Sequence, residues 1–441
     1  MLRPLIRCRF GLLLPVFLLL LAACGTGASS NAGAPVIAAF AASPDRVEAG
    51  REVTLSWRVS GADRLLLLPG NIDVTGAREI TMPVTDNGSF ALVASNSRGS
   101  RTAVTTVQLH DWRALDDTLD SARAVGTISG ASFVLVDRIG TLHEHSVGNI
   151  ALAQKVPLAS ASKLPTVMAI LTLVDSGELD LDRPVADYLA RDRDFVWPPD
   201  KAAITTRMLL AHTAGLVGLG DTQPDCLLLE RLTTLRDCAQ VIARTALVAT
   251  SGSAFNYGGA DMQVAAYVAS LLSGRNWHAF FASRISGPLG IRMQFDYGDA
   301  GQTANPRVAG GASATASAYA RLLRVLLDDG LFDGQRVLSS AMVNAILSDQ
   351  TRGLPVLFEP FPDGREADYP AYGLGVFLSA ARLHRGSPGP EYSDPGLFGA
   401  TPWIDRGLGY GGVLLIENST DVGLDLWDAL RPSIIRQLTG R

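Results

Sequence analysis

The chain has 441 residues, of which 47% are hydrophobic and 18% are charged, and its formal net charge at pH 7 is −5. This length and composition are typical of a globular protein with two or three domains. The sequence contains no basic run, no glycine-rich phosphate loop and no Cys/His pattern with metal-ligand spacing, which argues against nucleic acid, a nucleotide cofactor or a metal ion as partners.

Residues 1–23 have the pattern of a lipoprotein signal peptide. Three arginines precede the apolar run 10–21, which is too short to span a bilayer. The run leads into Leu-Ala-Ala-Cys, which resembles a bacterial lipobox and implies that Cys24 is lipidated after cleavage. An ordinary secretory peptide is the alternative. Under both interpretations the mature protein leaves the cytoplasm. With the lipid anchor it is expected in the cell envelope, and in a host with two membranes Gly25 favours the outer membrane, facing the periplasm or the cell surface.

Residues 24–33 are rich in glycine and serine and are interpreted as a flexible tether. Between 34 and 110 the hydrophobic residues alternate with polar ones, which predicts several short strands, with Trp57 turned inward. Such a run of strands is typical of a β-sandwich. The segment also resembles the immunoglobulin-like modules of bacterial surface proteins. We expect a spacer, and a ligand-binding module is the alternative.

From residue 111 onward, helix and strand patterns occur together. An amphipathic helix is predicted over 111–126, two strands over 130–149 and a long apolar helix that ends at Gly177. Later patterns predict helices at 261–273, 316–329 and 425–438, and strands at 372–378 and 401–419. This order predicts an α+β domain over 111–441, with a mostly antiparallel sheet flanked by helices.

Only two cysteines follow the lipobox, Cys226 and Cys238. In an oxidising compartment, two thiols so close in sequence favour a disulfide. A buried, unpaired pair is the alternative.

Ser160 precedes Lys163 by three residues at the start of the apolar helix. Proline is tolerated in the first turn of a helix, so Pro165 places Ser160 at or just before the helix start. Lys163 then lies on the same helix face, within reach of the serine hydroxyl. A neighbouring base activates such a serine, and a desolvated lysine can be that base. Ser162 is a rival, and a simple helix cap with a solvated lysine is the alternative to catalysis.

The segments 158–189 and 204–216, which surround this pair, resemble the serine β-lactamase-like superfamily. That group includes class C β-lactamases, D-alanyl-D-alanine carboxypeptidases and family VIII esterases. The resemblance covers about 330 residues, from 111 to the C-terminus, and 255–274 and 305–311 extend it. It implies a β-lactamase/transpeptidase-like fold with a helical subdomain, and acylation of Ser160 with Lys163 as proton acceptor, without a cofactor.

The other two motifs of the superfamily match unevenly. Tyr257 matches the tyrosine of the second motif, Tyr-x-Asn, which implies a general acid–base role, but Gly259 replaces the asparagine. His212 is tempting as a base, yet the resemblance implies a structural role for it. Trp403 is expected to pack within a strand, or else to wall the pocket.

The third motif, normally Lys-Thr-Gly or His-x-Gly, aligns with Asp394 and Gly396. The same alignment implies that the backbone N–H of Leu397 joins that of Ser160 in an oxyanion hole. An aspartate at position 394 is expected to repel a substrate carboxylate.

We therefore expect an envelope-anchored serine hydrolase that prefers neutral esters. A penicillin-binding or D-Ala-D-Ala peptidase-like activity, or β-lactamase activity, on a peptidoglycan-like substrate is one alternative. The other is a catalytically inactive lipoprotein that binds at the cell surface.

Overall fold

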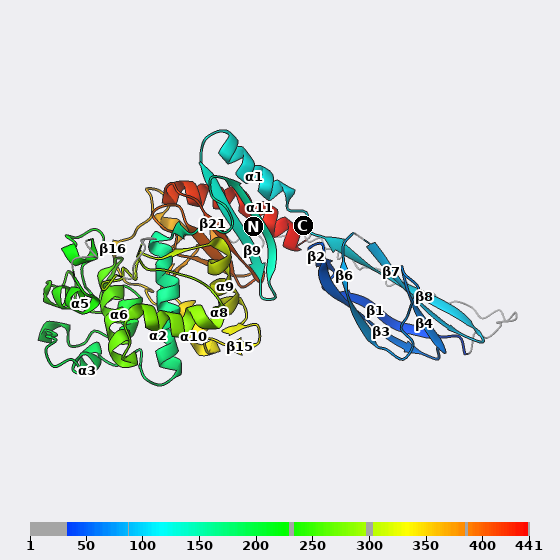
Figure 1. The fold of residues 1–441 in the computed structure, drawn as a ribbon, viewed down its shortest axis with the longest axis horizontal. Helices are drawn as coiled ribbons and strands as arrows, with labels where there is room; N and C mark the ends of the chain where they lie inside the picture. Colours follow the sequence, from blue (N-terminus) through cyan, green and yellow to red (C-terminus); the bar gives the residue numbers. More distant parts are fainter. Residues whose placement is uncertain (1–32, 87, 229–232, 297–302, 384–386, 440–441) are drawn as a thin grey trace, which may run out of the picture. The chain divides into compact units, whose positions relative to one another are not determined.

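The computed structural model describes residues 33–86, 88–228, 233–296, 303–383 and 387–439. The predicted signal peptide, Cys24 and almost all of the tether lie outside these residues. The chain divides into two compact units, Met1–Leu109 and His110–Arg441 (Figure 1). None of the helices in the described ranges is both long and apolar enough to cross a membrane.

The first unit consists of two β-sheets. One sheet has the strand order β1 (Val36–Ser43), β3 (Arg51–Ser60), β6 (Glu79–Val84). The other has the order β2 (Arg46–Val47), β8 (Gly99–Leu109), β7 (Gly88–Asn96), β4 (Arg64–Leu68), β5 (Ile72–Asp73). Trp57 lies in the core of this unit, and its Nε1 donates a hydrogen bond to the Ala77 carbonyl at 3.0 Å. The alternating sequence pattern therefore corresponds to an all-β unit with its own core.

The second unit is built on a seven-stranded antiparallel sheet. Its strand order is β10 (Thr141–Gly148), β9 (Gly130–Asp137), β21 (Tyr410–Leu415), β20 (Thr401–Asp405), β19 (Glu391–Ser393), β18 (Phe377–Leu378), β17 (Ala371–Tyr372). The first and last parts of the unit thus meet in one sheet, which is the α+β arrangement that the pattern of elements predicts.

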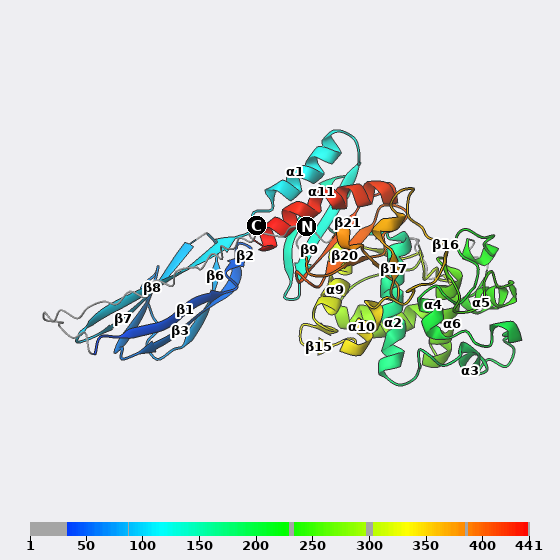
Figure 2. The ribbon, with the colours of Figure 1, turned by 180° about the vertical axis from the view of Figure 1, so that it is seen from behind.

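Helices cover both faces of this sheet because its central strands are apolar on both sides. In β9, Phe133 and Leu135 share a core with α1 (Arg113–Ala124) and α11 (Thr420–Thr439). Val134 and Val136 point the other way, into the core that includes α9 (Ala316–Leu327). Figure 2 shows α1 and α11 side by side, and the two helices are in contact.

The remaining helices form a helical subdomain around α2 (Lys163–Asp175). Residues 163–173 of α2 are all buried, as expected for a helix that is apolar all round. Around it lie the longer helices α5 (Leu235–Arg244) and α6 (Ala260–Ser273). The shorter ones are α3 (Val185–Leu189), α4 (Thr206–Leu210), α7 (Trp277–Phe281), α8 (Gly287–Leu289) and α10 (Ser340–Ile346).

A buried ion pair fixes α11 against β19. Glu391 and Arg431 are 2% and 8% exposed, and Arg431 Nη2 lies 2.9 Å from Glu391 Oε2. Trp427 Nε1 donates a hydrogen bond to the same carboxylate at 3.2 Å. Because Asp394 follows β19 directly, this pair helps to hold the strand that delivers Asp394.

Two expected elements differ from the observed ones. The C-terminal helix begins at Thr420 rather than 425, because the Ser419 hydroxyl accepts a hydrogen bond from the Val422 N–H at 3.4 Å and caps it. The single strand expected over 372–378 is a hairpin, β17 and β18. Gly375, with φ of +77°, turns the chain between them.

Candidate active site

Ser160 lies in a 3₁₀ turn, Ala159–Ser162, that leads into α2. Ala159 has φ of +45°, a conformation that side chains other than glycine seldom adopt. The turn is held in place by tertiary contacts, among them the hydrogen bond from the Leu158 N–H to the Ala312 carbonyl at 2.8 Å. As a result Ser160 is half-buried at the turn, while its neighbours on either side are buried.

Lys163 contacts the Ser160 hydroxyl directly. Its Nζ donates to Ser160 Oγ at 3.1 Å and to the Ala309 carbonyl at 3.1 Å, and lies 4.2 Å from the centre of the Tyr257 ring. The side chain is 2% exposed. Burial lowers the pKa of Lys163 to about 8, against the opposing effect of the Asp394 charge. A lysine that titrates near neutrality therefore lies beside the serine.

The rival serine, Ser162, has a structural role. It is fully buried, and its hydroxyl accepts a hydrogen bond from the Ala312 N–H at 3.0 Å. Of the two serines, Ser160 is the one that lines the cavity described next.

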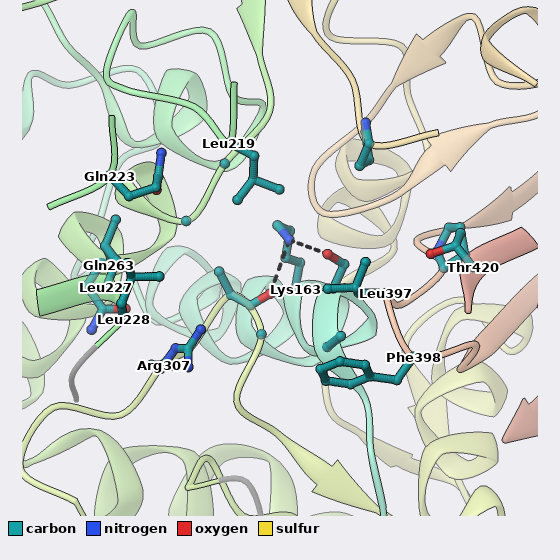
Figure 3. A pocket seen from close by; sticks show the side chains of 18 residues that line it. Lys163, Leu219, Gln223, Leu227, Leu228, Gln263, Arg307, Leu397, Phe398 and Thr420 are labelled. Carbon is teal, nitrogen blue, oxygen red and sulfur yellow. Dashed lines mark hydrogen bonds between the residues drawn. The ribbon is translucent and has the colours of Figure 1, made fainter. Parts of the chain in front are cut away.

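A cavity of about 190 Å³ opens over Ser160 and Lys163 (Figure 3). Its walls are mainly apolar side chains, namely Leu219, Leu227, Leu228, Pro360, Pro395, Leu397 and Phe398. Its polar side chains are Gln223, Gln263, Arg307 and Thr420, besides the serine and the lysine. Leu397 and Leu228 are 66% and 55% exposed, which is unusual for large apolar residues that gather at one place. This apolar wall was not among the sequence-based candidates.

Tyr257 follows the short strand β12 (Phe255–Asn256) and is buried behind the serine. Its hydroxyl donates to Asp394 Oδ1 at 2.7 Å, and the hydroxyl of Tyr372 lies 3.4 Å from Asp394 Oδ2. Burial raises the pKa of Tyr257 well above its ordinary value, and the Asp394 charge raises it further, whereas a hydrogen bond with Ser160 acts in the opposite direction.

The Asp394 side chain points in a different direction from the one expected. It is 1% exposed, does not line the cavity, and is turned toward the tyrosines rather than toward a substrate. Burial raises the pKa of Asp394 to about 7, while the Lys163 charge and the hydrogen bonds from Tyr257 and Tyr372 oppose that rise. The third-motif carboxylate thus faces Tyr257 and Tyr372.

Gly396 lies in the loop after β19, and this loop packs closely against the turn that contains Ser160. A Cβ atom on Gly396 would lie 2.1 Å from the Leu158 carbonyl oxygen and 3.3 Å from the Ala159 Cβ. Ser160 and Leu397 both line the cavity, and within the described ranges neither backbone N–H donates to a protein acceptor. Two such donors beside a nucleophile can stabilise the oxyanion of a tetrahedral intermediate.

The asparagine of the second motif has no replacement here. Gly259 leaves open space, because a Cβ atom there would meet nothing closer than Ala309 Cβ at 3.8 Å. Asn256 is buried and donates to the Leu216 carbonyl at 3.1 Å and to Asp221 Oδ2 at 2.9 Å. The site therefore presents no amide group at the position of that asparagine.

His212 lies behind the tyrosines. Its ring centre is 4.9 Å from that of Tyr257 and 5.3 Å from that of Tyr372, and its Nδ1 lies 3.3 Å from Asp261 Oδ2. Burial lowers the pKa of His212 well below its ordinary value, so the ring is neutral. This placement fits a structural role.

Trp403 packs in the core and does not wall the cavity. It is fully buried and stacks on Trp427, with ring centres 3.4 Å apart. His143 and His145, on β10, lie within hydrogen-bond distance of Asp116 and Asp120 of α1. Across the part of the chain that the structure describes, no three His, Cys, Asp or Glu side chains are placed to hold a metal ion.

Cys226 and Cys238 form a disulfide. It joins the turn Asp225–Leu227 to α5, and Asn305 Nδ2 donates to the Cys226 carbonyl at 2.8 Å. The disulfide therefore holds the segment that supplies two leucines to the cavity wall.

Comparisons with known proteins concern the family and the fold of the second unit. The family model described as Beta-lactamase matches residues 115–430. Protein Rv1367c of Mycobacterium tuberculosis is 27% identical over an alignment that covers 74% of this chain and 96% of that protein.

Among solved structures, a putative beta-lactamase from Bacteroides dorei has a TM-score of 0.62 and is 25% identical, covering 75% of this chain and 99% of its own. The structure of EstCE1, described as a hydrolase with promiscuous acyltransferase activity, has a TM-score of 0.58 and is 17% identical, covering 73% of this chain and 98% of its own. The latter likeness is one of fold. The matched family model and the arrangement of Ser160, Lys163 and Tyr257 together show that this chain belongs to the beta-lactamase family of serine hydrolases.

Proposed function

We propose that the protein hydrolyses neutral esters with apolar acyl groups through an acyl-enzyme on Ser160. The observation that carries this proposal is the 3.1 Å contact between Ser160 Oγ and Lys163 Nζ at the base of an apolar cavity. Lys163 and Tyr257 are the groups proposed to activate the serine hydroxyl. The N–H groups of Ser160 and Leu397 are the donors proposed for the oxyanion hole.

The preference for neutral esters rests on what the third motif presents to the cavity. A cation or donor at that place would hold a substrate carboxylate, but Asp394 is an acid and is buried away from the cavity. The neighbouring lining residues, Pro395, Leu397 and Phe398, have apolar side chains. An ester with an apolar acyl group has no carboxylate that the site must bind, and burial of its acyl chain against these side chains makes the free energy of binding more favourable.

A penicillin-binding or peptidase-like activity is the second candidate, and Arg307 is the observation that favours it. This guanidinium lines the cavity and is half-buried. An arginine in such a place can bind a carboxylate with two parallel hydrogen bonds.

Kinetics on matched substrates test the proposal. Purified residues 34–441 are assayed with 4-nitrophenyl acetate, butyrate and octanoate, and are separately incubated with benzylpenicillin. We expect ester turnover that is abolished in Ser160→Ala, with no change in melting temperature, and no stable penicilloyl adduct. A penicilloyl adduct on Ser160 without ester turnover would favour the second candidate. Absence of both reactions in a folded protein would favour an inactive binding lipoprotein.

We also propose that the protein is a lipoprotein of the cell envelope, held through Cys24, with an immunoglobulin-like spacer before the hydrolase domain. The lipobox pattern and the two-sheet organisation of residues 36–109 support this. Metabolic labelling with a palmitate analogue, followed by fractionation, tests the anchor. Label that persists in Cys24→Ala, or wild-type protein without label, would contradict it.

A further inference from the structure

We propose that Asp394 is a positioning residue that draws the hydroxyl proton of Tyr257, so that Tyr257 can take the proton of Ser160 during acylation. The inference rests on the proposed acyl-enzyme at Ser160. It assigns the final proton acceptor to the third-motif aspartate rather than to Lys163.

The geometry forms a chain of three side chains. Lys163 Nζ lies between Ser160 and Tyr257, 3.1 Å from Ser160 Oγ and 4.2 Å from the centre of the Tyr257 ring. The Tyr257 hydroxyl donates to Asp394 Oδ1 at 2.7 Å, and the Ser160 hydroxyl is among the groups that shift the pKa of Tyr257. A phenol that gives its hydrogen to a carboxylate keeps an oxygen lone pair free to accept one. The tyrosine is thereby oriented by the acid behind it, as a catalytic histidine is oriented by an aspartate in other serine hydrolases.

The contacts of Lys163 favour a cation rather than a proton acceptor. Its Nζ donates to Ser160 Oγ and to the Ala309 carbonyl, and it also lies over the ring of Tyr257. Burial lowers the pKa of Lys163 to about 8, and the negative charge of Asp394 opposes that shift and favours the ammonium form, which can satisfy all three directions at once. In this position the lysine stabilises negative charge as it develops on the serine oxygen.

The proton balance closes over one acylation. As Ser160 Oγ bonds to the ester carbonyl carbon, its proton moves to Tyr257 Oη and the Tyr257 proton moves to Asp394 Oδ1. When the tetrahedral intermediate collapses, the bond to the leaving oxygen breaks and Tyr257 protonates that oxygen. Asp394 then returns its proton to Tyr257. The net result is transfer of the serine proton to the released alcohol.

The groups that face Asp394 come from four places in the fold. They are Lys163 of α2, Tyr257 after β12, Tyr372 of β17, and Tyr319 of α9, whose pKa is raised by burial and by the Asp394 charge. Since burial raises the pKa of Asp394 to about 7, the ionised, proton-accepting form increases as the pH rises through neutrality. The relay therefore predicts that kcat/KM rises with pH along a limb centred near pH 7.

Asp394→Asn separates a relay from a purely structural role. Asparagine keeps an oxygen that can accept the hydrogen bond of Tyr257, but it cannot take a proton. We expect kcat/KM for 4-nitrophenyl butyrate to fall at least about 10²-fold, the usual worth of general base catalysis, and the limb near pH 7 to disappear. A folded Asp394→Asn with the wild-type rate and pH profile would overturn the inference while leaving the proposed function intact.

Two further variants keep the test decisive. Tyr372→Phe removes a hydrogen bond that lowers the pKa of Asp394, so we expect the limb to move to higher pH, and an unmoved limb would contradict the relay. Tyr257→Phe and Asp394→Asn should cost no more together than the larger cost alone, because they break the same path. If the rate loss of the double variant equalled the product of the two single losses, the relay would be overturned. Loss of turnover in the wild type itself would instead count against the proposed function.

Discussion

Gly396→Ala should disable the enzyme without unfolding it. The new Cβ would lie 2.1 Å from the Leu158 carbonyl oxygen and 3.1 Å from its carbonyl carbon, whereas ordinary carbon contacts are about 3.5 to 4.0 Å. Because both sides of this contact are main chain, the segment that carries Leu397 has to retreat from Ser160 by about 1 Å or more. A displacement of that size costs about 10²-fold in rate, and loss of one oxyanion donor costs about 10²- to 10³-fold.

We therefore expect kcat for 4-nitrophenyl butyrate to fall about 10²- to 10³-fold, with a loss of about 1 to 3 kcal/mol of stability from overpacking. Steady-state kinetics and thermal unfolding measure the two effects. Gly389→Ala is the matched control, since a Cβ there would meet nothing within 4 Å. A folded Gly396→Ala with a wild-type kcat would refute the placement of Leu397 in the oxyanion hole.

Three other predictions follow from the site. Replacing Cys226 and Cys238 by serine should lower the free energy of unfolding by about 3 kcal/mol, measured by thermal unfolding. It should also raise KM for octanoyl esters in steady-state kinetics. An unchanged melting temperature would contradict the stabilising role of the disulfide. Phe398→Ala should lower kcat/KM about 10-fold for the octanoate but little for the acetate, and equal losses would argue against an acyl site at this wall. Folding raises the pKa of Asp394 from 3.8 to about 7, so the folded state keeps a proton that the unfolded state has lost, and stability falls as pH rises between these values. The stability advantage of Asp394→Asn should therefore widen from pH 4 to pH 7 in denaturant titrations, and a constant difference would contradict the shifted pKa.

The sequence was informative where the relevant signal is local. Ser160 and Lys163 are one helical turn apart, so their contact needs no knowledge of the rest of the fold, and Pro165 limits where the helix can begin. The strand pair 130–149 and the helix at 316–329 were likewise predictable, because their periodicities extend over whole elements. The structure shows β9 and β10 in the first range and α9 in the second.

The direction of the Asp394 side chain was not predictable, because Tyr257 lies 137 residues away and meets it only in the folded chain. The residues around Asp394 in the sequence would be the same whether its side chain were exposed to a substrate or buried against two tyrosines. The positive φ of Ala159 was not predictable either, because its turn is held by contacts with distant segments, such as the hydrogen bond from the Leu158 N–H to the Ala312 carbonyl. The apolar wall at Leu228 and Phe398 comes from irregular segments that carry no period of 2 or 3.6 residues.

Covalent labelling tests the central claim most directly. Purified residues 34–441 are incubated with a fluorophosphonate, and the adduct is located by intact and peptide mass spectrometry. An activated serine beside Lys163 predicts a single adduct on Ser160 that is absent in Lys163→Ala. A folded protein that stays unlabelled, or that is labelled on Ser162 or elsewhere, would contradict the assignment of Ser160 as the nucleophile.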